Sequence, residues 1–342
     1  MKNAKQILIT GGAGYIGSVL SKKLIASGYG IVILDNFTYT DMGIREIIRD
    51  PRVSVINGDI RDISAVRQSL KDVDCVIHLA AVANDPSGQL DPRLTQEVNY
   101  EVYPMLLDEA KKNGISRFLN ASTFGVYGKK DGINITEQEP LNPLKEYSVC
   151  KAKSEVIVRD YNNSDFTTLS LRCATVCGWS PRMRFDLIVN TLTFHAIINN
   201  KITVWGGQQK RPQIHIDDIT DYFIELINIP AEKIGGKIYN AGGQNTTILE
   251  IAQSIKEIMG DTVDIIDAPP RDDERTYHVS SKKIAEDLNL MPQKTIKDAI
   301  KGIIHAYDQG LWKNPLDSLY HNVRRMKLLG MDMERNMEAI VK

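Results

Sequence analysis

The pair Tyr147 and Lys151, four residues apart, is the pattern in this sequence best suited to proton transfer. On a helix this spacing puts both side chains on one face. A phenol titrates at about pH 10 and is a poor base at neutrality, but a nearby ammonium group would lower its pKa. Thr123, which follows Ser122, could hydrogen-bond the oxygen of a substrate. The trio of Thr123, Tyr147 and Lys151 therefore suits oxidation of a secondary alcohol, with Tyr147 as proton acceptor.

A glycine-rich turn at residues 10–17, Thr-Gly-Gly-Ala-Gly-Tyr-Ile-Gly, is the second chemical pattern. An apolar run before it and a helical pattern after it predict a buried strand, a tight turn and a helix. Gly11, Gly14 and Gly17 would let the chain turn, let backbone N–H groups approach a pyrophosphate, and let helix and strand pack closely. The phosphates would lie at the positive end of the helix dipole.

Asp35 identifies the dinucleotide that this turn would hold. It ends a second predicted strand at residues 31–34, 18 residues after Gly17, where a carboxylate can bind an adenosine ribose 2′-hydroxyl. It would repel a 2′-phosphate, and no arginine or lysine follows within residues 36–40. The sequence therefore predicts NAD rather than NADP as the cofactor.

An exposed pair on a solvated helix is the alternative interpretation of Tyr147 and Lys151. The sequence holds thirteen tyrosines, although only Tyr147 is followed by lysine four residues later. We favour catalysis because the pair follows a dinucleotide-binding half at the spacing that this chemistry needs. A bound positive nicotinamide ring would lower the phenol pKa further, and Lys151 could also hold the nicotinamide ribose.

These residues need a framework, and the hydrophobic pattern predicts an α/β protein. Strand signals at 53–56, 75–79, 117–121 and 167–172 alternate with helical patterns such as 94–112, which favours a Rossmann-type, doubly wound parallel sheet. The second half would form a smaller, mostly helical, substrate-binding portion. Its predicted elements are a helix at 185–198, a strand at 201–205, a polar loop at 206–213, a strand at 214–216, helices at 217–227 and 249–259, and a strand at 237–240. We expect the NAD-binding domain to comprise 1–172 plus about 214–242, and the nucleotide-sugar-binding portion to comprise 173–213 and 243–342.

Composition and sequence pattern also indicate which binding partners and which cellular location to expect. The 342-residue chain has a formal net charge of −1, which gives no reason to expect nucleic acid or an anionic membrane as a partner. No apolar run approaches the roughly 20 residues that cross a bilayer. Because the first predicted strand begins almost at the N-terminus, we expect no signal peptide and a cytoplasmic location. The six histidines show no metal-ligand spacing, so we expect no metal.

Together these pieces resemble the extended short-chain dehydrogenase/reductases that act on nucleotide-activated sugars. Further matching segments are Asp35-Asn36, Gly58-Asp59, His78-Leu-Ala-Ala81, Asn99, Val126-Tyr-Gly128, Arg211 before Ile214-His215-Ile216-Asp217, and Tyr239-Asn240. The resemblance implies a Thr–Tyr–Lys triad and a homodimer through a four-helix bundle made by the helices at 94–112 and 146–161. The cofactor contacts that we expect are Gly11, Gly14, Tyr15, Ile16, Gly17, Asp35, Asn36, Asp59, Ile60, Leu79, Ala80, Ala81, Asn99, Tyr147 and Lys151.

Departures from the family pattern narrow the reaction. Sugar 4,6-dehydratases carry Asp-Glu directly after the catalytic threonine, where this chain has Phe124 and Gly125. The resemblance therefore implies hydride chemistry without dehydration, as in a nucleotide-sugar 4-epimerase or C4-dehydrogenase. The segment 180–190 resembles a bacterial subgroup that includes GDP-heptose 4-dehydrogenases. A 4-ketoreductase that uses NAD(P)H is the alternative, and a non-enzymatic dinucleotide-sensing module is disfavoured by the intact triad.

The diphosphate of a nucleotide sugar needs cations, and arginine is the natural bidentate partner. Arg211 is the first candidate, followed by Arg182, Arg184 and Arg275, although each could be an ordinary surface arginine. Asn190 could bind the sugar or the diphosphate. The remaining expected substrate contacts are Thr123 and Thr175, the latter standing where many epimerases have asparagine.

Overall fold

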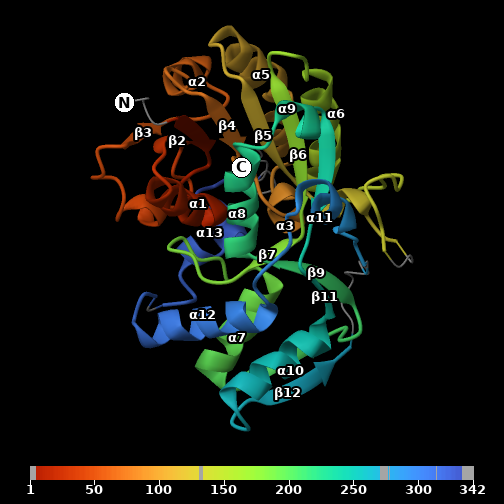
Figure 1. Ribbon diagram of the computed structural model, residues 1–342. Coiled ribbons are helices and arrows are strands. Elements are labelled where there is room, and N and C mark those ends of the chain that lie inside the picture. The colour runs from red at the N-terminus through yellow and green to blue at the C-terminus, as the bar shows by residue number, and fades with distance from the viewer. Residues whose placement is uncertain (1–4, 131–133, 270–275, 277, 313, 333–342) are drawn as a thin grey trace, which may run out of the picture.

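A seven-stranded parallel sheet dominates the upper part of the molecule in Figure 1. The computed structural model describes residues 5–130, 134–269, 276, 278–312 and 314–332. In spatial order the strands are β10 (Lys237–Ala241), β6 (Thr167–Cys173), β5 (Arg117–Thr123), β4 (Cys75–His78), β1 (Gln6–Thr10), β2 (Gly30–Asp35) and β3 (Val53–Asn57). Every neighbouring pair is parallel. This confirms the Rossmann-type, doubly wound sheet, whose strand order reverses direction at β1 and β4, where such sheets bind ligands.

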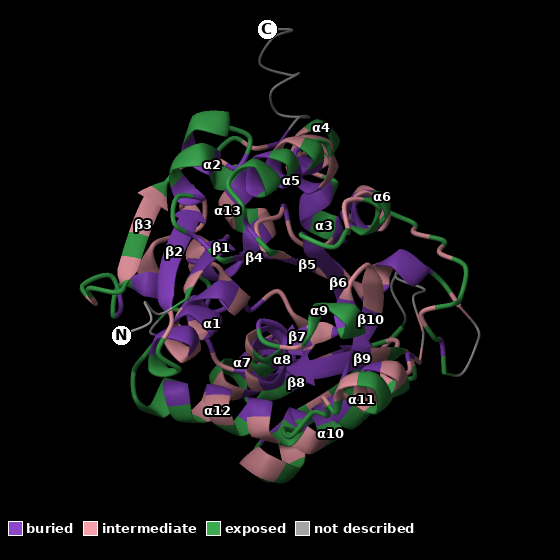
Figure 2. Cartoon of the chain, turned by 45° about the horizontal axis from the view of Figure 1, so that its top comes forward, coloured by how far each residue is buried: buried purple, intermediate pink, exposed green. Residues whose placement is uncertain are grey.

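Both faces of this sheet are buried, which explains its continuous apolar runs. In β1, Ile7 and Ile9 belong to one core and Leu8 to another. The helices over the first face are α1 (Tyr15–Ala26) and α8 (Ile216–Leu226), and those over the second are α2 (Ile63–Ser69), α5 (Tyr103–Lys112) and α6 (Glu146–Asp160). Figure 2 shows the buried strands enclosed between these helices.

The lower part of the molecule in Figure 1 has its own apolar core. Its elements are α7 (Ile188–Asn199), α10 (Ile248–Met259) and α12 (Ile296–Asp308), with the parallel pair β8 (Lys201–Trp205) and β12 (Asp264–Ala268). A small sheet of β11 (Gln244–Thr247), β9 (Lys210–His215) and β7 (Thr175–Cys177) lies between the two parts. This arrangement puts the second half of the chain against the carboxyl edge of the large sheet.

Several predicted elements differ from the observed ones. The helix expected at 94–112 begins at Pro92, because Asp91 caps it by accepting a hydrogen bond from the amide of Leu94. It comprises α4 (Pro92–Gln96), a π-helical turn η2 (Glu97–Glu101) and α5. The helix expected at 185–198 begins only at Ile188, because the backbone of Leu187 is extended.

The structure of segment 206–216 also differs from the predicted loop at 206–213 and strand at 214–216. Much of the expected polar loop is strand, and this strand, β9, pairs with β7 and β11 rather than with the large sheet. Of the segment 214–242, which the sequence predicts to return to the large sheet, α8 and Ile234 pack on that sheet and β10 joins it. The helix α8 begins at Ile216, where the ring of His215 accepts a hydrogen bond from the amide of Asp217.

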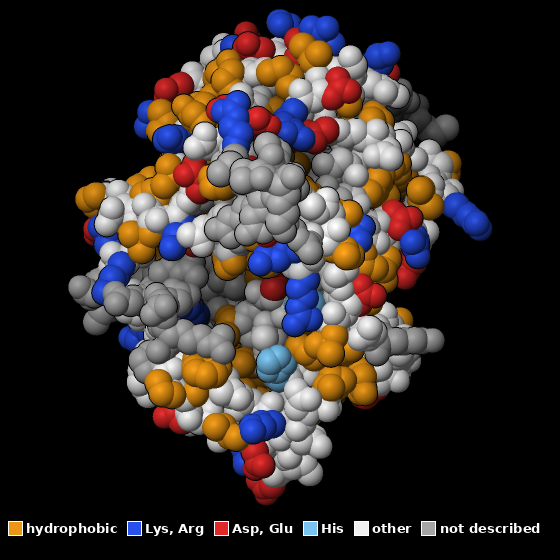
Figure 3. Space-filling view, turned by 180° about the vertical axis from the view of Figure 1, so that it is seen from behind, with side chains coloured by type: hydrophobic (Ala, Val, Ile, Leu, Met, Phe, Trp, Pro, Cys, Tyr) orange, Lys and Arg blue, Asp and Glu red, His pale blue; other side chains and the backbone are white. Residues whose placement is uncertain are grey.

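Short elements complete the described chain. They are η1 (Met42–Ile44), α3 (Asp85–Gly88), η3 (Phe124–Tyr127), α9 (Ala231–Ile234), α11 (Lys282–Leu288), η4 (Ser318–Tyr320) and α13 (Asn322–Leu328). Acidic and basic side chains intermingle on the face seen in Figure 3, as a net charge near zero suggests. Among the described helices, none is both long and apolar enough to span a bilayer.

Candidate active site

A cavity of about 660 Å³ lies at the carboxyl ends of strands β1, β2, β4, β5 and β6. Its opposite wall comes from the lower part of the molecule, including Trp205, Arg211 and Ile248. Open α/β sheets bind ligands outside the carboxyl ends of their strands, and this volume is typical of small-molecule sites. The topology thus brings the two chemical patterns of the sequence into one cavity.

The glycine turn forms one end of this cavity. Gly11 has a φ of 72°, and a side chain there would meet the backbone of Ala80 at 2.8 Å. A side chain at Gly17 would meet the carbonyl oxygen of Gly11 at 2.5 Å. The helix can therefore pack this closely on the turn only because residue 17 is glycine. The helix α1 begins after Gly14, and no side chain caps it there. The backbone amides of its first turn are therefore available to an anion. This cradle fits the pyrophosphate of a dinucleotide.

Asp35 lines the cavity at the end of β2, as expected. Its carboxylate accepts hydrogen bonds from the amides of Ala13 (3.0 Å) and Phe37 (2.9 Å), and so ties the glycine turn to the loop after β2. A carboxylate has about four acceptor positions, which leaves capacity for ribose hydroxyls. Burial raises the pKa of Asp35, although these two hydrogen bonds act to lower it.

The other expected cofactor contacts fall into two groups. Those that line the cavity with the glycine turn and Asp35 are Tyr15, Ile16, Asn36, Asp59, Ile60, Leu79, Ala80, Ala81, Tyr147 and Lys151. Asn99 is fully buried and does not line it. Its side-chain amide instead forms two hydrogen bonds of 2.9 Å with the backbone of Val82. Asn99 therefore supports the loop after β4 without facing the cavity.

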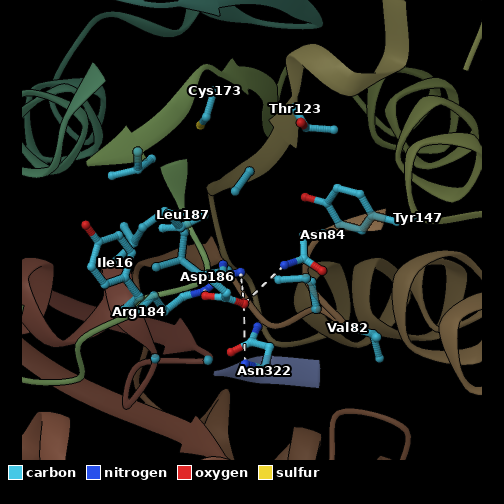
Figure 4. Close-up of a pocket in the computed structure, with 18 of the residues that line it drawn as sticks. Ile16, Val82, Asn84, Thr123, Tyr147, Cys173, Arg184, Asp186, Leu187 and Asn322 are labelled. Carbon is cyan, nitrogen blue, oxygen red and sulfur yellow. Dashed lines mark hydrogen bonds and ion pairs between the residues drawn. The ribbon is translucent and has the colours of Figure 1, made fainter. Parts of the chain in front are cut away.

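The three expected catalytic residues meet at the other end of the cavity. Thr123 ends β5, Tyr147 and Lys151 lie one turn apart on α6, and all three side chains line the cavity. Figure 4 shows Thr123 and Tyr147 close together on one wall. The ammonium of Lys151 donates to the carbonyl oxygen of Ala121 at 3.0 Å, and burial lowers its pKa to about 8. This grouping can exchange a proton with a substrate hydroxyl.

The electrostatics of Tyr147 correct the prediction that its pKa is lowered. Burial raises the pKa of the phenol, and the nearby carboxylate of Asp85 raises it further. The charge of Arg184 and the nearby Thr123 hydroxyl lower the pKa of Tyr147 but are smaller effects. Desolvation by the surrounding protein therefore outweighs any help that the sequence spacing suggested from Lys151.

The two positions after Thr123 carry no acid or base. Phe124 is buried, and a side chain at Gly125 would come within 2.5 Å of the Ser148 hydroxyl. That hydroxyl in turn donates to the carboxylate of Asp85 at 2.9 Å. The space beside Gly125 is thus filled by a serine–aspartate pair that comes from other parts of the chain.

Asp85 is one of several cavity residues that sequence reasoning missed. Asp186 is a second: its carboxylate forms two bonds with Arg184 (2.9 and 3.0 Å) and accepts from the Asn84 amide at 3.2 Å and the Asn322 backbone at 3.3 Å. Figure 4 shows this convergence of three distant segments. The sequence Asn-Asp-Pro at 84–86 signalled a helix start at most, and nothing near residue 322 signalled a site.

The expected substrate contacts have mixed outcomes. Thr123, Thr175, Arg182, Arg184 and Arg211 line the cavity. The guanidinium of Arg211 also donates to the Gln209 side chain at 3.0 Å. Arg275 lies outside the described residues.

Asn190 does not line the cavity, which corrects its expected role as a direct contact. It is fully buried, and its side chain accepts from the amide of Gly178 and donates to the Tyr15 hydroxyl and the Arg184 carbonyl oxygen. These bonds join the helix α1 to the segment that carries the arginines. Within the described part of the chain, no cluster of three or more His, Cys, Asp or Glu side chains could hold a metal ion.

Comparison with known proteins agrees with this geometry. Residues 7–242 match the NAD dependent epimerase/dehydratase family. A putative UDP-glucose 4-epimerase of Methanocaldococcus jannaschii is 30% identical over 305 residues, which cover 87% of this chain and 97% of the relative. These matches extend over the glycine turn, the triad and most of the lower part of the molecule.

Two solved structures show the same fold. A dTDP-glucose 4,6-dehydratase from Streptomyces venezuelae with NAD bound has a TM-score of 0.81 at 25% identity, covering 91% of this chain and 100% of its own. The UDP-glucuronic acid 4-epimerase of Bacillus cereus, in complex with UDP-glucuronic acid and NAD, has a TM-score of 0.80 at 27% identity, covering 89% and 99%. Epimerases and a dehydratase are thus similar to this chain at nearly equal levels, so overall likeness does not select the reaction.

Proposed function

The chain belongs to the NAD-dependent epimerase/dehydratase family, and we propose that it oxidises C4 of the sugar in a nucleoside-diphosphate sugar without removing water. The observation that carries the proposal is the contrast around Thr123. Thr123, Tyr147 and Lys151 form a complete proton-transfer group, whereas Phe124 and Gly125 supply neither acid nor base. A C4 hydroxyl can be oxidised here, but water loss lacks the residues that the family's dehydratases use.

In the proposed reaction, NAD⁺ supplies the acceptor for the hydride that leaves C4. Thr123 holds the C4 oxygen by a hydrogen bond, and the Tyr147 oxygen takes its proton as the carbonyl forms. We expect the ammonium of Lys151, one turn further along α6, to hold the nicotinamide ribose from the same face of the helix. Arg184 and Arg211 line the same cavity and are suited to the sugar diphosphate.

The ketone has two possible fates in this proposal. If hydride returns to the opposite face of the sugar, the product is the C4 epimer and the dinucleotide is regenerated in place. If the ketone leaves, the enzyme is a C4-dehydrogenase that holds NADH and needs a second oxidant. We expect the purified protein to retain its dinucleotide, since Asp35 favours NAD over the NADP that dedicated reductases more often use.

Incubation with UDP-, GDP-, CDP- and dTDP-sugars tests the proposal, followed by NMR in D₂O and by absorbance at the NADH band. A mixture of C4 epimers without net redox change indicates an epimerase. Stoichiometric ketone with protein-bound NADH indicates a dehydrogenase, and consumption of a 4-keto sugar with NAD(P)H indicates the alternative, a 4-ketoreductase. A 6-deoxy-4-keto product would contradict the interpretation of residues 124 and 125.

We also propose a homodimer through the helices α4–α5 and α6. On the first of these helices, Val102 and Leu106 point into the chain's own core, so they do not face a partner. On α6, Val156 is 47% exposed and is the apolar residue best placed for a partner. Because single exposed apolar residues are common on protein surfaces, the dimer proposal rests on the family resemblance, and Val156 marks the face at which to test it.

A further inference from the structure

Arg182 is a buried cation with an unused donor. Its side chain is 3% exposed, one terminal nitrogen donates to the Asn322 side chain at 2.6 Å, and the guanidinium lies 4.5 Å from the centre of the Tyr39 ring. Its Nε has no hydrogen-bond partner, although Arg182 lines the cavity. A buried guanidinium with an unsatisfied donor is costly, and a bound anion would offset that cost.

The surroundings of Arg182 belong to the dinucleotide end of the cavity. A side chain at Gly43 would lie within about 3 Å of the Ala13 carbonyl oxygen, of Ser18 on α1 and of the Arg182 stem, so these groups converge on one point. Beside it, the Ser180 hydroxyl bonds both Ser18 and the carbonyl oxygen of Tyr15, each at 2.8 Å. The segment that carries Arg182 therefore packs on the glycine turn and the start of α1.

Contacts distinguish Arg182 from its neighbour Arg184. The Arg182 guanidinium lies over the ring of Tyr39, in the loop that follows Asp35, and the stem of its side chain adjoins Gly43. Arg184 instead pairs with Asp186 and is among the charges that act on Tyr147. Although the two arginines are two residues apart, the first faces the dinucleotide end and the second the reacting end.

The C-terminal helix α13 holds this arrangement in place. Asn322 at its start binds Arg182 through its side chain and Asp186 through its backbone amide. One turn later, Nε of Arg325 donates to the carbonyl oxygen of Thr38 at 3.0 Å, in the loop that follows Asp35. Thus α13 connects the arginine segment to the ribose loop, as Figure 4 shows for Asn322 and Asp186.

We propose that Arg182 binds the pyrophosphate of the dinucleotide, rather than the diphosphate of the sugar nucleotide, and that α13 is a clasp over the adenosine half of the cofactor. The proposal rests on the cofactor part of the proposed function and not on the reaction at C4. It assigns to residues 322–325 a role in cofactor affinity that their distance in sequence from the glycine turn conceals.

The test compares Arg182→Met, Asn322→Ala and Arg325→Ala with Arg324→Ala, a control on the same helix whose side chain donates to the Leu316 carbonyl oxygen. Two quantities are measured without any sugar substrate: dinucleotide retained after purification, and dissociation constants of the stripped protein for NAD⁺, ADP-ribose, UDP, GDP, CDP and dTDP. Charge-assisted hydrogen bonds to anions predict about 10- to 100-fold weaker NAD⁺ and ADP-ribose binding for Arg182→Met. Asn322→Ala and Arg325→Ala should each weaken it several-fold.

The expected control result is unchanged affinity in Arg324→Ala, together with unchanged binding of the nucleoside diphosphate that the wild type prefers in every variant. If Arg182→Met weakens that nucleoside diphosphate but not NAD⁺, the arginine serves the sugar nucleotide and the proposal is wrong. Unchanged NAD⁺ affinity in both Asn322→Ala and Arg325→Ala overturns the clasp. If Arg182→Met does not fold, these two variants still decide the proposal. Because no turnover is measured, failure of the C4 assignment leaves the result intact.

Discussion

The hydroxyl of Ser148 donates a hydrogen bond of 2.9 Å to the carboxylate of Asp85, and this contact joins the helix α6 to the loop after β4. The negative charge of Asp85 acts on Tyr147, the residue directly before Ser148. In the proposed reaction Tyr147 must accept a proton, so this charge opposes the ionisation that the reaction needs. Asp85 therefore influences the pH at which the enzyme works.

The first prediction concerns this pH dependence. Because burial and Asp85 raise the pKa of Tyr147, its base form is scarce at neutrality, and sugar oxidation should speed up as pH rises. Asp85→Asn removes the negative charge, lowers the phenol pKa and moves the rising limb of kcat/KM to lower pH. Ser148→Ala keeps the charge and serves as the control. A profile unchanged in Asp85→Asn would show that the carboxylate does not act on Tyr147.

Tyr147→Phe should abolish turnover while dinucleotide binding survives. The change removes the proton acceptor but keeps the ring, and loss of a general base costs about 10²–10⁴ in rate. The matched control is Tyr161→Phe, at the end of α6, which removes a hydroxyl that donates to Asp108. Steady-state rates and NAD⁺ binding are measured together, and near-wild-type turnover would refute the triad.

The protein should bind NADH more tightly than NADPH. Asp35 is fixed by two backbone amides at the ribose end of the cavity, where its charge repels a 2′-phosphate. Replacement by asparagine should narrow the difference, whereas Asp41→Asn, at an exposed ion pair with Arg45, should not. Fluorescence titration with both cofactors gives the ratio, and tighter NADPH binding by the wild type would overturn the assignment.

Glu155→Gln should strongly destabilise the fold. Glu155 and Arg172 form a buried ion pair. The hydroxyl of Ser122, the residue before Thr123, donates a hydrogen bond to Glu155. Removing one charge of a buried pair typically costs about 3–5 kcal/mol. The exposed pair of Arg159 and Asp160 provides the control, since Asp160→Asn should change the unfolding free energy by less than about 1 kcal/mol. Urea denaturation compares them, and equal losses would contradict the prediction.

Val156→Asp should weaken the proposed homodimer by placing a charge on the outward face of α6. Ile198→Asp, at a similarly exposed apolar residue on α7, should leave the association unchanged. Sedimentation at micromolar concentration separates the species. A wild-type chain that sediments as a monomer would contradict the dimer itself.

What the sequence determined alone was local. The glycines of the turn, the continuous apolar strands and the four-residue spacing of Tyr147 and Lys151 each depend on nearby geometry: positive φ, two-sided burial and the pitch of a helix. For this reason the parallel sheet and the grouping of the triad could be predicted before any contact was known.

The tertiary structure decided everything that depends on desolvation or on distant partners. Burial, which has no local signature, raises the pKa of Tyr147 where the sequence predicted a lower one. Asn99 and Asn190 became buried supports of neighbouring backbone because long-range packing surrounds them. Asn322, far along the chain, binds Arg182, because only the folded chain brings α13 to the cavity.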